Sequence, residues 1–137
     1  MHVLLVEDNG ILTTLFGVQL RQLGDHTLTT ASTIPAAMAA FSQEIFDLIF
    51  IDMGLDGLPD GGLKLLTQIK AQAPHQRAGV LSSNDLREMV RLSQKAGADF
   101  YMVKPFTLEG LAVVLGGDKE AMRSYVSGID EGRIIAF

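Results

Sequence analysis

The strongest constraint on the fold is an alternation of five short apolar runs with longer segments of helical pattern. The runs occupy residues 2–6, 26–31, 47–51, 78–82 and 99–103. The first, third and fifth are almost continuously apolar, which is typical of strands covered on both faces in a parallel sheet. The second alternates polar and apolar residues and is the best candidate for an edge strand.

The segments between these runs carry apolar residues at helical spacing. Two of them show it clearly: Leu12, Leu15, Phe16, Leu20 and Leu23, and later Leu108, Leu111, Ala112 and Leu115. Ser32 or Thr33 can cap the second helix, with Pro35 in its first turn. Regular β–α alternation predicts an α/β fold, a doubly wound parallel sheet with helices on both faces.

The length, net charge and cysteine content of the chain exclude several classes of protein. A chain of 137 residues favours one domain. The net charge of −5, with no basic stripe, argues against direct nucleic-acid binding. There is no cysteine, so thiolate metal sites and disulfides are excluded. Neither a signal peptide nor an apolar run of membrane-spanning length is present. We therefore expect a cytoplasmic protein that does not enter a membrane.

Charged and hydroxyl residues follow directly after the predicted strands. The first strand leads into Glu7 and Asp8, the third into Asp52, the fourth into Ser82 and the fifth into Lys104. In an open parallel α/β sheet, ligands bind outside the carboxyl ends of the strands. All five side chains are therefore expected on one rim of the sheet.

Three carboxylates on one rim repel each other unless a cation joins them. Oxygen ligands without histidine or cysteine select a hard ion, Mg²⁺ or Mn²⁺. Lys104 adds a mobile positive charge that can meet an anion. This set suits phosphoryl transfer, in which an aspartate can act as nucleophile and form an acyl phosphate. Pro105 favours extended geometry at Lys104, and the sequence leaves the isomer of that peptide bond open.

An ordered set of motifs resembles the receiver domain of two-component response regulators over about residues 1–117. The motifs are "LLVEDN" (4–9), "DLIFIDMGL" (47–55), "VLSS" (80–83), "GAD" (97–99) and "YMVKPF" (101–106). The resemblance implies a five-stranded parallel sheet in the flavodoxin-like order 2-1-3-4-5, which is the order known for receiver domains.

The resemblance also implies roles for individual residues. Asp52 corresponds to the phosphoacceptor. Glu7, Asp8, Asp52 and the main-chain carbonyl of Gly54 correspond to the Mg²⁺ ligands.

Three further positions match the residues that respond to the phosphoryl group. Ser82 corresponds to the hydroxyl residue that shifts toward the group and Lys104 to the lysine that pairs with it. Tyr101 corresponds to the aromatic switch residue. The implied phosphodonor is a phosphohistidine on a sensor histidine kinase or a histidine phosphotransfer protein, and the responding surface spans approximately residues 85–115.

The loop after the phosphoacceptor departs from the family pattern. The family usually has a proline four positions after that aspartate, whereas here position 56 is Asp and the proline is Pro59. The loop at 54–62 therefore looks lengthened by one or two residues. Asp56 and Asp60 could add negative potential beside the metal site or simply face water.

Two other functions remain to be weighed against a phosphorylated receiver. One is a pseudo-receiver, an interaction module that works without phosphorylation. The other is a hydrolase with an aspartyl-phosphate intermediate, but such enzymes usually need a second Asp where this chain has Gly54. We therefore expect a switch that accepts a phosphoryl group, and could lose it by autodephosphorylation, rather than an enzyme turning over external substrates.

The segment at 118–137 is expected to be a partly helical tail with no output domain. Met122, Tyr125, Val126 and Ile129 fall on one helical face, and "RIIAF" ends the chain. The tail could dock on the domain, mediate a homodimer or begin a linker. The downstream partner is accordingly either a separate protein or an output domain missing from this sequence.

Overall fold

A six-stranded sheet forms the centre of the molecule, in the order β2-β1-β3-β4-β5-β6. The computed structural model describes residues 1–125 and 133–137. The strands are β1 (His2–Val6), β2 (Thr27–Ala31), β3 (Leu48–Asp52), β4 (Ala78–Ser82), β5 (Phe100–Val103) and β6 (Ile134–Ala136). The first five are parallel, and β6 pairs antiparallel with β5.

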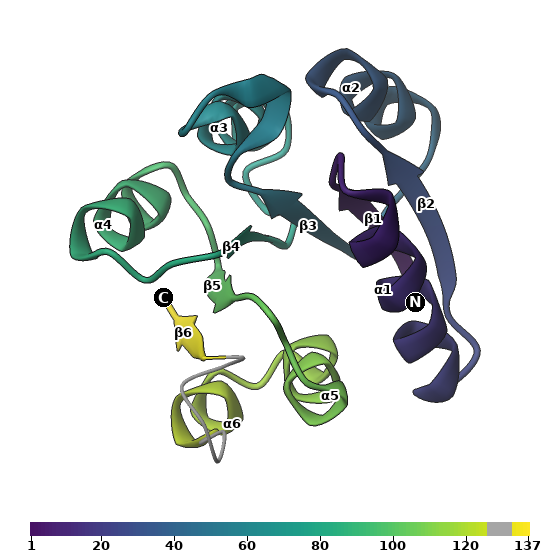
Figure 1. The fold of residues 1–137 in the computed structure, drawn as a ribbon. Coiled ribbons are helices and arrows are strands. Elements are labelled where there is room, and N and C mark those ends of the chain that lie inside the picture. Colours follow the sequence, from purple (N-terminus) through teal and green to yellow (C-terminus); the bar gives the residue numbers. More distant parts are fainter. Residues whose placement is uncertain (126–132) are drawn as a thin grey trace.

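Helices cover both faces of this sheet, as the β–α alternation predicts (Figure 1). They are α1 (Gly10–Gln22), α2 (Ile34–Gln43), α3 (Gly61–Gln72), α4 (Arg87–Lys95), α5 (Leu108–Gly116) and α6 (Lys119–Ser124), with a 3₁₀ turn η1 (Leu55–Gly57). Helices α1, α5 and α6 lie on one face, and α2, α3 and α4 lie on the other. Within the described residues, no helix has the length and apolar character needed to cross a bilayer.

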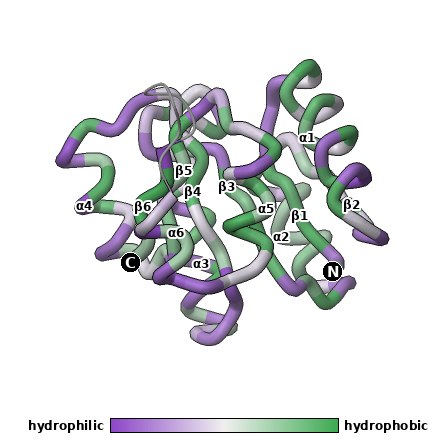
Figure 2. Tube along the Cα trace, turned by 90° about the horizontal axis from the view of Figure 1, so that it is seen from below, coloured by the Kyte–Doolittle hydropathy of each residue, from purple (hydrophilic) through white to green (hydrophobic). Residues whose placement is uncertain are grey.

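Two apolar clusters, one on each face, bury the sheet. Phe16 of α1 and Leu111 of α5 pack with Phe50 on one face. Leu65 and Ile69 of α3 pack with other strand residues on the opposite face. Figure 2 shows the strands as the hydrophobic centre of the chain trace and α4 as largely hydrophilic. Burial of apolar area on both faces is the main term that stabilises this arrangement.

Short polar side chains fix where the helices begin. Asn9 caps α1 by accepting hydrogen bonds from the backbone N–H groups of Ile11 and Leu12. Thr33 caps α2, and Thr107 caps α5. The cap at Asn9 starts α1 directly after the acidic pair, so the first turn of the helix holds the end of β1 in place.

The strand register explains how the carboxyl ends meet. Val6 lies opposite Ile51, so Glu7, which directly follows β1, lies beside Asp52, the last residue of β3. Asp52 is opposite Leu81. Ser82 is opposite Val103, so Lys104 follows beside it. The rim predicted from strand polarity is confirmed by this register.

The sheet has six strands rather than the five expected from sequence. The order 2-1-3-4-5 is confirmed, and β6 extends it beyond β5. The tail forms the short helix α6, ending at Ser124, while Val126 and Ile129 lie outside the described residues. The three-residue β6 was missed because a run this short has no distinctive period. Its pairing satisfies backbone N–H and C=O groups of β5 that would otherwise lie unpaired at the edge of the sheet.

Candidate functional site

The centre of the candidate site is an ammonium group held between two buried carboxylates. Lys104 Nζ donates to Glu7 Oε1 at 2.7 Å and to Asp52 Oδ1 at 2.8 Å. The side chains of Lys104, Glu7 and Asp52 are 17%, 1% and 10% exposed. These residues come from the ends of β5, β1 and β3. The peptide bond between Lys104 and Pro105 is cis.

Asp8 completes a cluster of three carboxylates. Glu7, Asp8 and Asp52 each offer an oxygen that lies within 4.8 Å of the others. Asp8 is exposed, whereas Glu7 and Asp52 are buried. Oxygen donors at this spacing fit a hard divalent cation such as Mg²⁺. Because the side of the cluster at Asp8 is open to solvent, a bound ion could keep the water ligands that Mg²⁺ usually retains.

The three carboxylates are not equivalent. Glu7 Oε2 accepts the backbone N–H groups of Asp8 at 3.0 Å and Asn9 at 3.4 Å, while Oε1 accepts Lys104. Both oxygens of Glu7 therefore already have protein donors. Asp52 meets Lys104 through Oδ1, and its Oδ2 faces Gly54, where an added Cβ would lie 3.9 Å away. Asp8 and Asp52 are thus the carboxylates best placed for direct contact with a ligand.

Excess negative charge shifts the ionisation of the cluster. Burial raises the pKa of Glu7 and the nearby charge of Asp52 raises it further, against the opposing hydrogen bond from Lys104. Burial alone would lower the pKa of Lys104, but its bonds to Asp52 and Glu7 outweigh that effect and raise it. Lys104 stays charged, and the cluster favours a second cation.

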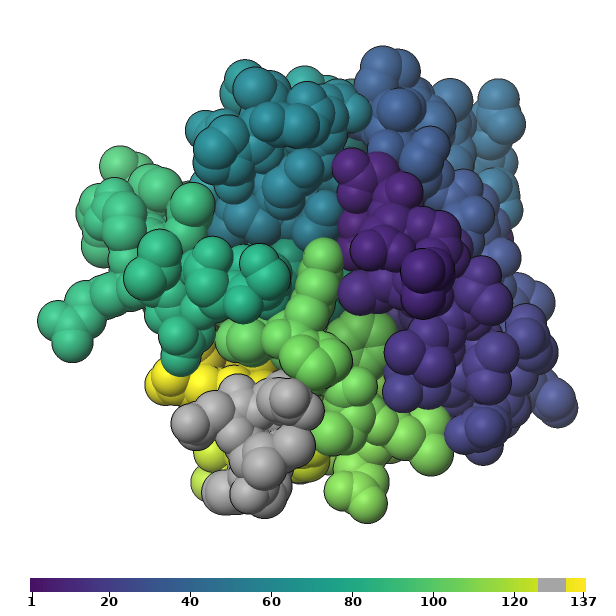
Figure 3. Space-filling view, in the orientation of Figure 1, coloured from purple at the N-terminus to yellow at the C-terminus, as the bar shows by residue number. Residues whose placement is uncertain are grey.

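A hollow of about 360 Å³ opens beside this cluster. It is lined by Asp52, Met53, Gly54, Pro59, Ser82, Ser83, Asn84, Met89 and Lys104. Figure 3 shows the N-terminal, middle and β5–α5 parts of the chain meeting near the centre of this face. Ser82 is only 3% exposed and belongs to the rim of the hollow. The carboxylate of Asp52, the hydroxyl group of Ser82 and the ammonium group of Lys104 therefore all border one hollow.

The loop at 54–62 folds tightly against the end of β3. Asp56 has a positive φ of 57° within η1. A Cβ added at Gly62 would lie 2.2 Å from the carbonyl oxygen of Asp52, so no side chain fits there. Asp56 and Asp60 are both exposed. The side chains of Asp56 and Asp60 therefore face water, which is one of the two alternatives that the sequence left open. Pro59 of the same loop lines the hollow.

Tyr101 connects β5 to the loop between β4 and α4. Its side chain is fully buried, and its hydroxyl donates to the backbone oxygen of Asn84 at 2.6 Å. The backbone N–H of Asn84 in turn lies 3.4 Å from Ser82 Oγ. Burial raises the pKa of the Tyr101 phenol, and the charge of Asp85 adds to this. The sequence does not indicate the position of Asn84 in this chain of contacts, because its bonds to Tyr101 and Ser82 are made by backbone groups.

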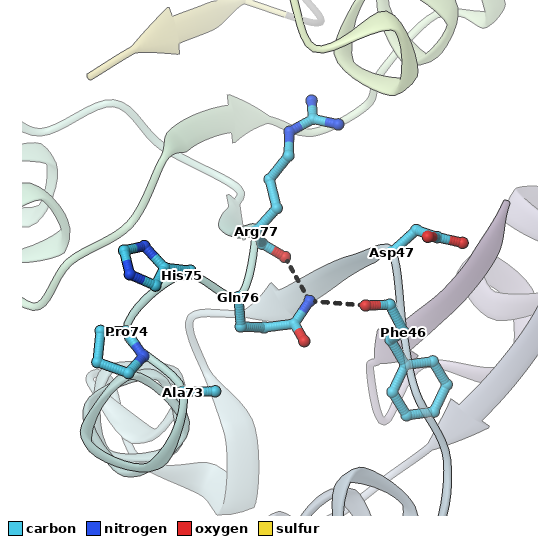
Figure 4. Close-up of a pocket in the computed structure, with 7 residues that line it drawn as sticks. All are labelled: Phe46, Asp47, Ala73, Pro74, His75, Gln76 and Arg77. Carbon is cyan, nitrogen blue, oxygen red and sulfur yellow. Dashed lines mark hydrogen bonds between the residues drawn. The ribbon is translucent and has the colours of Figure 1, made fainter.

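A second hollow, of about 470 Å³, lies at the amino ends of the strands (Figure 4). It lies between the residues before β3 and those before β4. Gln76 fills part of it, with Nε2 donating to the backbone oxygens of Phe46 and Arg77 at 3.1 Å each. The side chains of Asp47 and Arg77 bind backbone groups of His2 and Val114, so this hollow lacks the cluster of carboxylates found at the carboxyl edge.

The fold and the site define a class of protein: a doubly wound α/β domain with an acidic site and a lysine at the carboxyl edge of its sheet. Residues 3–115 match the response regulator receiver domain family. The chain belongs to this family, the receiver domains of two-component systems. Such domains are signalling modules that bind Mg²⁺ at an acidic pocket and interact with histidine kinases and output domains.

Individual proteins show the same likeness. The chain is 34% identical over 104 residues to the alginate biosynthesis transcriptional regulatory protein AlgB of Pseudomonas aeruginosa, covering 76% of this chain and 22% of that regulator. A response regulator from Thermotoga maritima superposes with a TM-score of 0.76 at 27% identity, over 85% of this chain and 94% of the other.

A CheY-like receiver domain protein from Methanospirillum hungatei has a TM-score of 0.77 at 22% identity, over 90% of this chain and 98% of that chain, which supports the fold alone. By contrast, the chain spans only about a fifth of the length of the alginate regulator, AlgB.

The structure gathers all seven residues singled out from the sequence at or next to one site. Their individual roles stay predictions. They are Glu7, Asp8, Asp52, Gly54, Ser82, Tyr101 and Lys104.

Proposed function

We propose that this chain is a phosphorylation switch in which Asp52 accepts a phosphoryl group in the presence of Mg²⁺. The observation that carries the proposal is the position of Lys104, held between Asp52 and Glu7 beside a cluster of three carboxylates. A structural ion pair would balance its charge. This cluster keeps two more acidic groups than its lysine can neutralise, which suits a site for a cation and a phosphoryl group.

Asp8, Asp52 and the main-chain carbonyl of Gly54 would hold the ion, with Glu7 contributing through its charge. The bound ion supplies charge neutralisation for phosphoryl oxygens. An oxygen of Asp52 attacks the phosphorus of a phosphohistidine, the P–N bond breaks, and the imidazole leaves. The product is an acyl phosphate on Asp52.

Lys104 and Ser82 then take new partners. The new phosphoryl group carries negative charge and acceptor oxygens close to Lys104 Nζ, which already contacts Asp52. Ser82 lines the same hollow and can turn its hydroxyl toward the group. The ring of Tyr101 is already buried, so its response would be a change in its hydrogen bond to Asn84.

The phosphodonor partner in this proposal is a sensor histidine kinase or a histidine phosphotransfer protein in the cytoplasm. The responding surface comprises α4, β5 and α5. Helix α4 contacts β5, and the loop from β4 to α4 begins directly after Ser82. A shift of Ser82 would therefore reach this surface through the adjoining loop. The partner of that surface is a separate protein or an output domain.

The test is phosphorylation by acetyl phosphate with Mg²⁺, read by intact-protein mass spectrometry. The native chain is expected to gain one phosphoryl group and Asp52→Asn none. Asp56→Asn is the matched control, because Asp56 is exposed in the same loop and should leave phosphorylation intact. Equal labelling of the native chain and Asp52→Asn would exclude Asp52 as the acceptor.

A further inference from the structure

The last residues of the chain close the edge of the sheet next to the site. Strand β6 lies beside β5, on the side away from β4 (Figure 1). The N–H of Val103 donates to the oxygen of Arg133 at 2.8 Å, and that of Phe137 donates to Asp99 at 3.0 Å. We call residues 133–137 the C-terminal segment. Their pairing hides the β5 edge from any other chain.

The C-terminal segment also holds the loop that follows Ser82. Arg133 Nη1 lies 2.5 Å from Asp85 Oδ2. Asp85 is three residues after Ser82, in the loop between β4 and α4. The two side chains are 60% and 49% exposed, so this ion pair is screened by solvent and weak by itself. It nevertheless ties the segment to the part of the chain expected to move with Ser82.

A second route connects the segment to the same loop through β5. Ile135 is paired with Tyr101, and Ile134 with Met102. The hydroxyl of Tyr101 holds the carbonyl of Asn84, whose N–H faces Ser82 Oγ. The backbone of Tyr101 therefore faces the C-terminal segment while its side chain contacts the loop. Movement of that loop changes the surroundings of the strand on which β6 pairs.

The chain leading to the segment contacts the other side of the site. The hydroxyl of Tyr125 and Oγ1 of Thr107 lie 2.5 Å apart, and Thr107 caps α5 three residues after Lys104. The tail thus contacts the loop after β4, the strand β5 and the start of α5. Pairing with β5 alone would not give the contacts with the loop after β4 and with the start of α5.

We propose that the C-terminal segment is an autoinhibitory strand whose pairing with β5 is coupled to the state of Asp52. Pairing favours the free carboxylate, and phosphorylation weakens pairing. The inference rests on the proposed function, because it assigns a regulation to the same site.

The direction of coupling follows from the contacts. In the structure Lys104 binds the free carboxylate of Asp52, and its backbone N–H donates to the oxygen of Ser82 at 2.7 Å. The contacts of Arg133 with Asp85 and Val103 are formed in this same state, with Asp52 unphosphorylated. A phosphoryl group that draws the Ser82 hydroxyl away from Asn84 shifts the loop and Asp85 with it. Coupling is reciprocal, so weakening the segment must favour the phosphorylated state by the same factor.

The first experiment measures amide hydrogen exchange in residues 133–137 of the full chain, with and without beryllofluoride and Mg²⁺. We expect exchange at least about fivefold faster with the phosphoryl mimic, at the lower end of typical coupling. Calorimetry on the native chain and on Asp52→Asn shows whether the mimic binds at Asp52. Binding at Asp52 with unchanged exchange would overturn the inference alone. Equal binding to both proteins would overturn the proposed function and this inference together.

The second experiment tests reciprocity. Arg133→Ala should bind beryllofluoride more tightly than the native chain, by up to about fivefold, because the exposed ion pair with Asp85 is a weak contact. The control is Arg123→Ala, which removes an exposed arginine from α6. Ile135→Pro gives an independent variant. Arg133 bonds to Val103 and Phe137 to Asp99, so strand alternation directs the N–H of Ile135 toward Tyr101. Proline lacks this N–H. Unchanged affinity in Arg133→Ala and in folded Ile135→Pro would refute the coupling.

Discussion

Each end of the sheet carries a lysine bound to buried or half-buried oxygens, and the two arrangements differ in charge balance. At the amino end, Lys70 donates to the backbone oxygen of Gln76 at 2.5 Å and to Asp99 Oδ2 at 3.1 Å. The same oxygen of Asp99 accepts the N–H of Ala78 at 2.9 Å. One carboxylate meets one ammonium group, and backbone groups complete the set.

At the carboxyl end, one ammonium group faces three carboxylates. Lys104 neutralises part of the charge of Glu7 and Asp52, and Asp8 remains beside them. The amino-end network connects α3 to the starts of β4 and β5 and is complete without a ligand. We infer from this difference that a buried lysine alone does not indicate a functional site, whereas uncompensated negative charge around it does.

The largest expected difference between the two ends comes from Lys104→Met. The change leaves Glu7 and Asp52 buried without their cation, so we expect the free energy of unfolding to fall by about 3 kcal/mol at pH 7 without Mg²⁺. Urea unfolding followed by circular dichroism measures it. Native-like stability would show that solvent already compensates these carboxylates.

Mg²⁺ should act on one end only. At a concentration 100 times its Kd, it should raise the free energy of unfolding of the native chain by about 2.7 kcal/mol. Asp8→Asn should reduce that gain at the same concentration, and Asp99→Asn should keep it. Thermal unfolding with and without MgCl₂ gives the comparison. A full gain in Asp8→Asn would place the ion away from the acidic cluster.

Lys70→Met should have a smaller effect than Lys104→Met, about 1 kcal/mol. Asp99 keeps the N–H of Ala78 and is 33% exposed, so the loss of the ammonium group leaves it partly compensated. Phosphorylation by acetyl phosphate should be unchanged. A loss of stability equal to that of Lys104→Met would remove the contrast between the two ends.

The smallest effect concerns pH. The pKa of Glu7 is raised in the folded protein, so the native state binds more protons than the unfolded chain between pH 4.5 and that raised value. Its contribution to stability is therefore complete below pH 4.5 and is lost as pH rises through the folded pKa. Glu7→Gln should remove this loss, seen as a flatter dependence of unfolding free energy on pH.

The control for this pH effect is Glu88→Gln. The hydrogen bond from Arg91 lowers the pKa of Glu88, which lies exposed on α4. Its replacement should leave the decline above pH 4.5 in place. If both variants flatten the curve equally, the decline does not come from Glu7.

Most of the fold and the gathering of the site could be predicted because they depend on local patterns and strand polarity. The apolar runs define five strands, and parallel pairing brings Glu7, Asp52 and Lys104 to one rim. The division of labour among the carboxylates could not be predicted, since it depends on which backbone N–H groups reach Glu7. The contact of Asn84 with Tyr101 and the pairing of β6 could not be predicted either, because both join parts of the chain that are distant in sequence.

The backbone bond from Phe137 to Asp99 determines where anything attached to the end of this chain would emerge. Asp99 precedes β5, whereas Asp52 and Lys104 lie at the far end of the strands. A fluorescent protein or other cargo fused after Phe137 would therefore sit beside the amino-end network, remote from the acidic rim. Such a fusion would leave the surface around Asp52 accessible to a kinase. Its linker would be attached directly to β6, the strand that covers the edge of β5.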